Sequence, residues 1–148
     1  DLSRNLLEEV DWPLLAARAP ALRSLALAGN QLEALLAAAP LPSLRQLDVG
    51  ENHVARLQLE GLAGLRELRA AGNRLARLPP LARLEELRLL DVRANILRRL
   101  PADLCRLPHL AVLEVAGNPL GPSVPPRLHS GAAAELLRHL ARRSALLQ

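Results

Sequence analysis

Six asparagines recur along this chain at a nearly constant interval. They are the only asparagines among the 148 residues, and consecutive ones lie 25, 22, 21, 22 and 23 residues apart. A period in the low twenties is typical of solenoids, in which each repeat buries its apolar side chains only against its neighbours. The spacing predicts one stack of about six repeats over residues 1–129, the first of them truncated. The six are Asn5, Asn30, Asn52, Asn73, Asn95 and Asn118.

Apolar residues keep a fixed register to these asparagines. Residues 22–32 read L-x-x-L-x-L-x-x-N-x-L around Asn30, and the same frame recurs around the four later asparagines with Leu, Val or Ala at the apolar positions. The L-x-L alternation puts two apolar side chains on one face of a short strand, and stacked strands form a parallel sheet. A further column, five residues after each Asn, should point inward: Val10, Leu35, Leu57, Leu78 and Leu100.

The repeated frame resembles that of the leucine-rich-repeat family. The resemblance implies an α/β solenoid, a right-handed superhelix with a concave parallel β-sheet and with convex turns or short helices. It also implies that the six asparagines stack as a structural ladder at the bends that follow the strands. A side-chain amide suits such a bend, because it can both donate and accept hydrogen bonds where buried backbone groups lose their sheet partners.

The first return segment departs from the frame. Asp11 suits a helix N-cap and Pro13 a first helical turn, so we expect a short helix there. Trp12 should pack within that segment rather than contact a partner. Because the chain opens within the frame at Asp1, we also expect further repeats upstream of it.

Residues 130–148 are predicted to form a C-terminal capping helix and tail. Four apolar residues fall on one helical face there, and such a face would cover the core of the last repeat. The segment after Asn118 resembles the closing segment of cytosolic leucine-rich-repeat proteins of the Ras-pathway scaffold kind. The four apolar residues are Ala133, Leu136, Leu137 and Leu140.

Composition and motifs argue against several classes of function. The chain has no Lys, Phe or Tyr, and so lacks both a phosphate-loop lysine and an aromatic platform for stacking bases. No metal-ligand spacing, nucleophile elbow or glycine-rich nucleotide loop is present, so we expect no enzyme activity, metal, cofactor or small-molecule substrate. The net charge of +4 comes from 19 arginines scattered among 15 acids, which argues against nucleic-acid binding.

Two observations favour a cytoplasmic protein. Cys105 is the only cysteine, so no disulfide can form within the chain, and no Asn begins a glycosylation sequon. In addition, no apolar stretch approaches the roughly 20 residues that a membrane-spanning helix needs. We therefore expect no membrane span.

A surface for another protein is the function that the repeat favours. The residue between the two apolar positions of each L-x-L pair, with the residues two before and two after it, should face outward on the concave side. The charges there could neutralise one another across strands, as in the column of Asp48, Arg69 and Asp91, or could form a docking strip. Two exposed apolar residues favour docking. The candidate partner-binding residues are Asp48, Glu67, Arg69, Leu89, Asp91, Arg93, Val112 and Glu114.

The sequence is accordingly interpreted as a non-catalytic protein–protein interaction module, a scaffold or regulatory subunit that binds a protein through its concave face. One alternative is that it is the adaptor region of a larger enzyme, such as a ligase or a phosphatase. A weaker alternative is an RNA-associated repeat protein, whose binding would depend steeply on salt.

Overall fold

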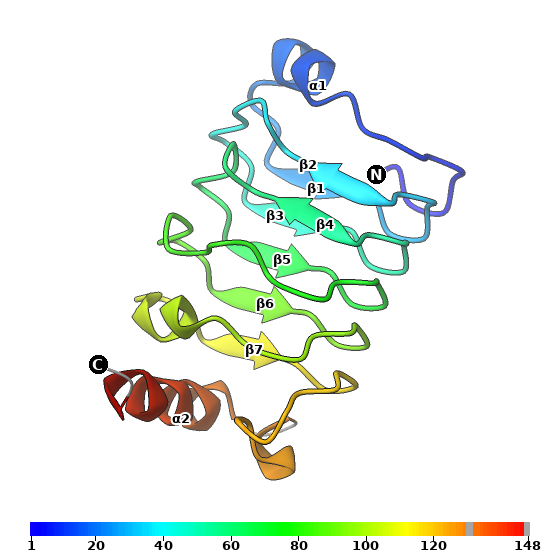
Figure 1. The fold of residues 1–148 in the computed structure, drawn as a ribbon. Helices are drawn as coiled ribbons and strands as arrows, with labels where there is room; N and C mark the ends of the chain where they lie inside the picture. Colours follow the sequence, from blue (N-terminus) through cyan, green and yellow to red (C-terminus); the bar gives the residue numbers. More distant parts are fainter. Residues whose placement is uncertain (130–131, 147–148) are drawn as a thin grey trace.

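A computed structural model describes residues 1–129 and 132–146 (Figure 1). The strands are short and stacked, and helices are confined to the two ends and to a few return segments. The strands are β1 (Ser24–Ala26), β2 (Ala34–Leu36), β3 (Gln46–Asp48), β4 (Arg56–Gln58), β5 (Glu67–Arg69), β6 (Leu89–Asp91) and β7 (Val112–Glu114). The helices are α1 (Trp12–Arg18), η1 (Ala102–Arg106), η2 (Pro126–Leu128) and α2 (Ala133–Leu146), of which η1 and η2 are 3₁₀ helices.

The five strands that contain the repeated frame form one parallel sheet, in the order β1-β3-β5-β6-β7. Their middle residues are in register, and each is a buried leucine that points into the core. The second apolar residue of each L-x-L pair follows directly after its strand and is also buried. The fold class expected from the repeat, a solenoid of parallel strands closed by a C-terminal helix, is confirmed.

A second, two-stranded sheet lies on the return side of the solenoid. The strands β2 and β4 pair in parallel, with Leu35 opposite Leu57, and both leucines belong to the same core as the five-stranded sheet. This sheet was not among the expected elements. It covers only the early repeats, and the inward column is less buried in the later ones. Leu35 and Leu57 are 1% and 7% exposed, whereas Leu78 and Leu100 are only partly buried.

The asparagines at the bends join neighbouring repeats by hydrogen bonds. In Asn73, Oδ1 accepts from the backbone N–H of Val54 (2.9 Å), and Nδ2 donates to the carbonyls of Val49 (2.9 Å) and Ala70 (3.1 Å). Asn30, Asn52, Asn95 and Asn118 make equivalent bonds. All five are buried. Asn5 lies at the edge of the stack, where it is exposed and its side chain bonds only within its own repeat.

The residue before each asparagine has a positive φ in all six repeats. Glycine, which has no Cβ to clash in this left-handed conformation, alternates there with other residues. The other residues occupy the space beside each glycine: a Cβ added at Gly29 would lie 3.3 Å from Arg4 Cγ, and one at Gly117 would lie 3.2 Å from Ala94 N. This left-handed column is Arg4, Gly29, Glu51, Gly72, Ala94 and Gly117.

The first return segment is helical, as its cap signals predicted. Asp11 is the N-cap of α1, and its side chain accepts a hydrogen bond of 2.9 Å from the backbone N–H of Leu14. Trp12 is 4% exposed and is part of the core, which is the packing role expected of it.

At the other end, α2 packs against η1 and β7 and so covers the last repeat. On the inner face of α2 itself, Ala133, Leu136 and Leu140 are buried, and Leu137 is partly buried. The ring Nε2 of His139 lies 2.7 Å from the carbonyl of Ser123, which also ties α2 to the segment that precedes it. The expected start of the cap at residues 130–131 and the last two residues of the tail lie outside the described residues.

Candidate functional site

The exposed side of the five-stranded sheet carries two columns of side chains, which we call the sheet face. The first column is formed by the last residue of each strand. It consists of Asp48 on β3, Arg69 on β5, Asp91 on β6 and Glu114 on β7, all in direct register. The neighbouring column places Glu67, Leu89 and Val112 side by side on β5, β6 and β7. Pairing in register therefore brings the predicted site residues onto one surface, with Arg93 two residues after the end of β6.

The charges of the sheet face pair along the chain rather than across the strands. Arg69 forms an ion pair of 2.8 Å with Glu67 on its own strand. Arg93 holds Asp91 with both ends of its guanidinium, through Nε–Oδ1 (2.9 Å) and Nη2–Oδ2 (2.7 Å). The cross-strand neutralisation of Asp48, Arg69 and Asp91 by ion pairs, one of the two interpretations from the sequence, is not what the described residues form.

Asp91 is the most buried charged residue of the sheet face, with 7% exposure. Burial alone would raise the pKa of its carboxyl. The hydrogen bonds that it accepts from the side chain and the backbone N–H of Arg93, together with the positive charges of Arg93 and Arg69, outweigh burial and hold this pKa below its ordinary value. Asp91 is thus a fixed negative charge that orients Arg93, and little of its own surface is available to a partner.

The other aspartate of the column is more available. Asp48 is partly exposed, and its Oδ1 accepts a hydrogen bond from the backbone N–H of Gly50 (2.9 Å). Glu114, on the last strand, is also partly exposed. These two acids, the half-exposed Arg93 guanidinium and the ion-paired Arg69 and Glu67, whose side chains are 43% and 29% exposed, are the charged groups that the sheet face offers to solvent.

Leu89 and Val112 form an apolar pair within this charged surface. They are direct partners in the β6–β7 register, and Val112 is 39% exposed while Leu89 is partly exposed. Contiguous exposed apolar side chains on a sheet are a recognised sign of a binding surface. The pair gives the sheet face a small apolar patch at its β6–β7 end, with Glu67 and Glu114 beside it.

Arrangements for other chemistry are not found in the described parts of the chain. Within residues 1–129 and 132–146, no cluster of His, Cys, Asp and Glu is placed to hold a metal ion. Cys105 is partly buried on η1, and its thiol donates to the carbonyl of Ala102 (2.8 Å). None of the helices described here has the length and apolar character needed to cross a membrane.

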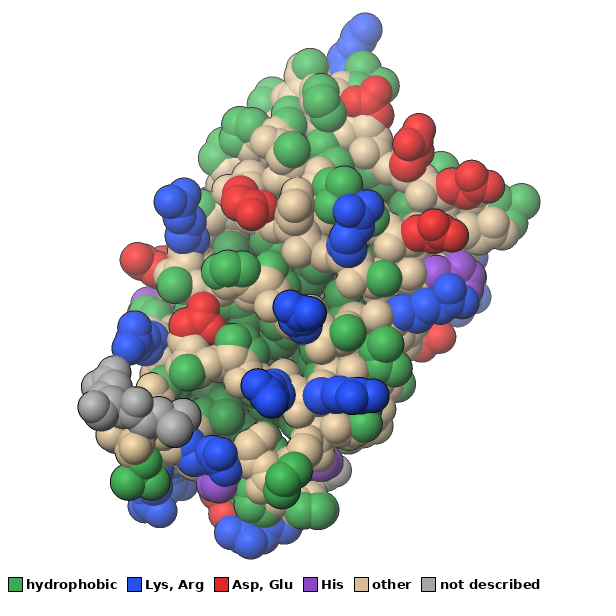
Figure 2. Space-filling view, viewed as in Figure 1, with side chains coloured by type: hydrophobic (Ala, Val, Ile, Leu, Met, Phe, Trp, Pro, Cys, Tyr) green, Lys and Arg blue, Asp and Glu red, His purple; other side chains and the backbone are tan. Residues whose placement is uncertain are grey.

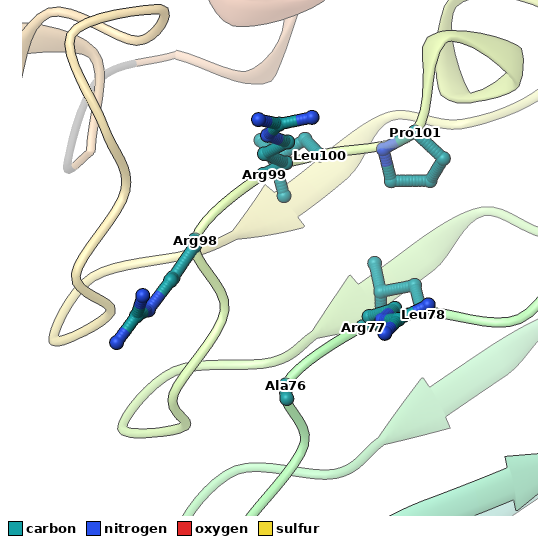
Figure 3. Close-up of a pocket in the computed structure, with 7 residues that line it drawn as sticks. All are labelled: Ala76, Arg77, Leu78, Arg98, Arg99, Leu100 and Pro101. Atoms are coloured by element: carbon teal, nitrogen blue, oxygen red, sulfur yellow. The ribbon is translucent and has the colours of Figure 1, made fainter.

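Reasoning from the sequence missed a basic groove on the return side. It opens between residues 76–78 and 98–101, and Figure 3 shows its arginines on two neighbouring return segments. Arg77 and Arg99 both lie four residues after a ladder asparagine, as Arg56 does one repeat earlier. Aligning that position in the repeats would have revealed a basic column that a count of scattered arginines does not show.

Comparison with known proteins supports the fold. No protein-family model matches this chain, and no curated protein matches its sequence. Among solved structures, the chain is similar to the functional domain of InlJ from Listeria monocytogenes, which includes a cysteine ladder (TM-score 0.66, 20% identity, 79% of this chain and 24% of that one). It is also similar to an internalin, inlF, from Listeria monocytogenes (TM-score 0.65, 22% identity, 78% of this chain and 34% of that one).

A third similar structure is a leucine-rich-repeat protein from Leptospira interrogans (TM-score 0.61, 25% identity, 97% of this chain and 41% of that one). The chain therefore spans from about a quarter to about two fifths of the length of these proteins. The stacked parallel strands, the buried asparagines at the bends and these three likenesses lead to one conclusion: the chain has the leucine-rich-repeat solenoid fold.

Proposed function

We propose that this chain is a non-catalytic protein-interaction module that binds a partner protein through its sheet face. The observation that carries the proposal is the apolar pair Leu89–Val112, which is exposed among charged side chains at the β6–β7 end of the sheet. An apolar centre surrounded by polar and charged side chains is the usual anatomy of a protein–protein interface.

The charges near this apolar pair suit a partner with basic and apolar groups. Asp48 and Glu114 present carboxylates to solvent, and the pairing of Arg93 with Asp91 reduces the positive charge between them. Such complementarity would mainly set specificity and the rate of association, whereas the apolar pair would contribute affinity.

Site-specific photo-crosslinking in cells tests the proposal. A photoreactive amino acid at position 112 should cross-link to a discrete protein that mass spectrometry identifies, and one at the exposed position Ala82, outside the sheet face, should not. The double variant Leu89→Ser/Val112→Ser should then lose the purified partner. Its matched control, Leu36→Ser/Ile96→Ser, removes two exposed apolar side chains elsewhere and should retain it. Equal cross-linking from positions 112 and 82 would count against the sheet face.

A scaffold or regulatory role in the cytoplasm is the finer form of this proposal. It draws on the lone Cys105, the absence of sequons and the resemblance of the closing segment to cytosolic Ras-pathway scaffolds. The alternative, an adaptor region of a larger ligase or phosphatase, makes the same use of the sheet face. The scaffold role and the adaptor role are distinguished by the fate of the cross-linked protein. An adaptor of a ligase or phosphatase predicts that this protein is a substrate and is chemically modified when this chain is present.

A further inference from the structure

The basic groove is a second surface, distinct from the sheet face. Its volume is about 660 Å³. Arg77, Arg98 and Arg99 line it together with Leu78, Leu100 and Pro101, and no acid occurs among the described residues that line it. In Figure 3 Leu78 lies beside Arg77 on one segment, and Leu100 lies beside Arg99 on the other, where Pro101 follows it.

The groove exists because the return segments separate after β4. The backbones meet at one end, where Ile96 N–H donates to the carbonyl of Leu75 (3.0 Å). At the other end the link is through a side chain, since Leu81 N–H donates to the carboxylate of Asp103 (3.0 Å). Between these points no backbone hydrogen bond joins residues 76–80 to residues 97–102 in the part of the chain described. Backbone groups there are open to an added strand, whereas β2–β4 pairing closes the same position between the earlier repeats.

The groove arginines carry charge that the fold does not neutralise. The ion pairs of the described residues involve Arg66, Arg69 and Arg93, and none involves an arginine of the groove. Arg77 and Arg99 stand at the same repeat position, and like charges on stacked segments repel each other. Figure 2 shows basic side chains gathered over the middle and lower part of this side, with hydrophobic side chains between them.

A groove of the opposite charge lies at the other end of the same side. It measures about 330 Å³ and is lined by Glu9 and Asp11, with Val10, Trp12 and Leu36 among its apolar residues. It lies between the return segments that follow Asn5 and Asn30. The basic groove lies between the return segments that follow Asn73 and Asn95, so both grooves occupy the same position in the repeat. Two equivalent, partly apolar grooves thus differ in the sign of their charge, and a basic lining is electrostatically suited to anionic rather than cationic ligands.

We propose that the basic groove binds an extended acidic peptide segment of a partner protein. Alternate side chains of an extended peptide point in opposite directions, so apolar ones can cover Leu78 and Leu100 while acidic ones reach the arginines at the rim. The open backbone edges offer main-chain hydrogen bonds to the same peptide. Bases of single-stranded RNA would find no aromatic side chain to stack on, since the groove has none.

Fluorescence anisotropy with a labelled peptide of alternating Glu and Leu tests this proposal. The double variant Arg77→Glu/Arg99→Glu should bind it at least about tenfold more weakly, the effect of losing one charge-assisted hydrogen bond or more. The matched control Arg83→Glu/Arg106→Glu should stay within about twofold. All four side chains are exposed, and both double variants lower the formal net charge from +4 to 0. Circular dichroism verifies that both remain folded.

Several results would overturn the proposal. Equal weakening in both double variants would show that net charge alone attracts the peptide, and so would unchanged affinity when its Glu residues are replaced by Gln. Polyuridine RNA or phosphatidylserine vesicles that bind more tightly than the peptide, and lose binding only in Arg77→Glu/Arg99→Glu, would assign the groove to a nucleic acid or a membrane instead. The sheet-face variant Leu89→Ser/Val112→Ser should bind the peptide normally, so the two proposals fail independently.

Discussion

Removal of one interior asparagine should destabilise the solenoid by an amount that its hydrogen bonds define. In Asn73→Ala, the backbone N–H of Val54 loses its acceptor inside the core, since Val54 is fully buried. Asn73 Nδ2 donates to three backbone carbonyls, and each of them keeps a second hydrogen-bond donor in the variant. Val49 retains Asn52 Nδ2 (3.0 Å), Ala70 retains Asn95 Nδ2 (2.9 Å) and Ala71 retains the N–H of Glu51 (2.9 Å).

The expected cost is therefore one orphaned donor plus weakened bonds to shared acceptors. The orphaned N–H costs about 1–3 kcal/mol, and each lost bond to a shared carbonyl costs at most about 1 kcal/mol. We expect the free energy of unfolding to fall by about 2–4 kcal/mol. In Asn73→Asp the carboxylate can still accept from Val54 but faces three carbonyl oxygens, so this variant should be at least as unstable as Asn73→Ala at neutral pH.

Urea unfolding followed by far-UV circular dichroism measures this loss, and an unchanged m-value verifies that unfolding remains one transition. Asn5→Ala is the matched control. Asn5 has the same repeat position but is exposed, so its loss should cost less than about 1 kcal/mol. A cost for Asn73→Ala below about 1 kcal/mol, or equal to that of Asn5→Ala, would refute the claim that the interior ladder stabilises the stack.

Three further predictions concern other features. Ala94→Gly should raise the unfolding free energy by about 0.5–1 kcal/mol, because glycine accepts the positive φ without strain, and a lower melting temperature would contradict this. Asp91→Asn should cost about 1–2 kcal/mol at pH 7. Because the folded pKa of Asp91 lies below its ordinary value of 3.8, this stabilisation is complete above that value and is lost as the pH falls through the folded pKa. The stability gap between the wild type and Asp91→Asn, measured by urea unfolding from pH 7 to pH 3, should therefore shrink, and a constant gap would contradict the assignment. Asp11→Ala should cost about 1 kcal/mol through loss of the α1 cap while Asp11→Ser costs much less, and equal urea midpoints for the two variants would contradict the capping role.

Periodicity predicted the five-stranded sheet well because its strands are set by burial. An inward leucine such as Leu47 or Leu68 has one side on which it can be buried, so the frame determines both the face and the register. The N-cap of α1 could be predicted equally well, because Asp11 and Pro13 stabilise the helix start through contacts with neighbouring residues in the sequence.

The features that depend on spacing between segments could not be read in the same way. Ala34-Leu-Leu36 carries no alternation, and whether it pairs as β2 depends on how closely the next return segment approaches. The ion pairs of Arg69 and Arg93 depend on which rotamer each long side chain adopts, since acids lie within reach on their own strand and on neighbouring ones. Register alone therefore indicated the cross-strand alternative that these residues do not form.

The left-handed column has a consequence for how such a chain can change length. Glycine and a larger residue alternate along it, and each larger residue occupies the space beside the glycine of the following repeat. Duplication or deletion of two consecutive repeats preserves this alternation at every junction. Duplication of a single repeat that carries the larger residue would place two side chains against each other. A pair of repeats, such as the 43 residues 30–72, is thus the unit that this solenoid can gain or lose while keeping a glycine beside every larger residue of the column.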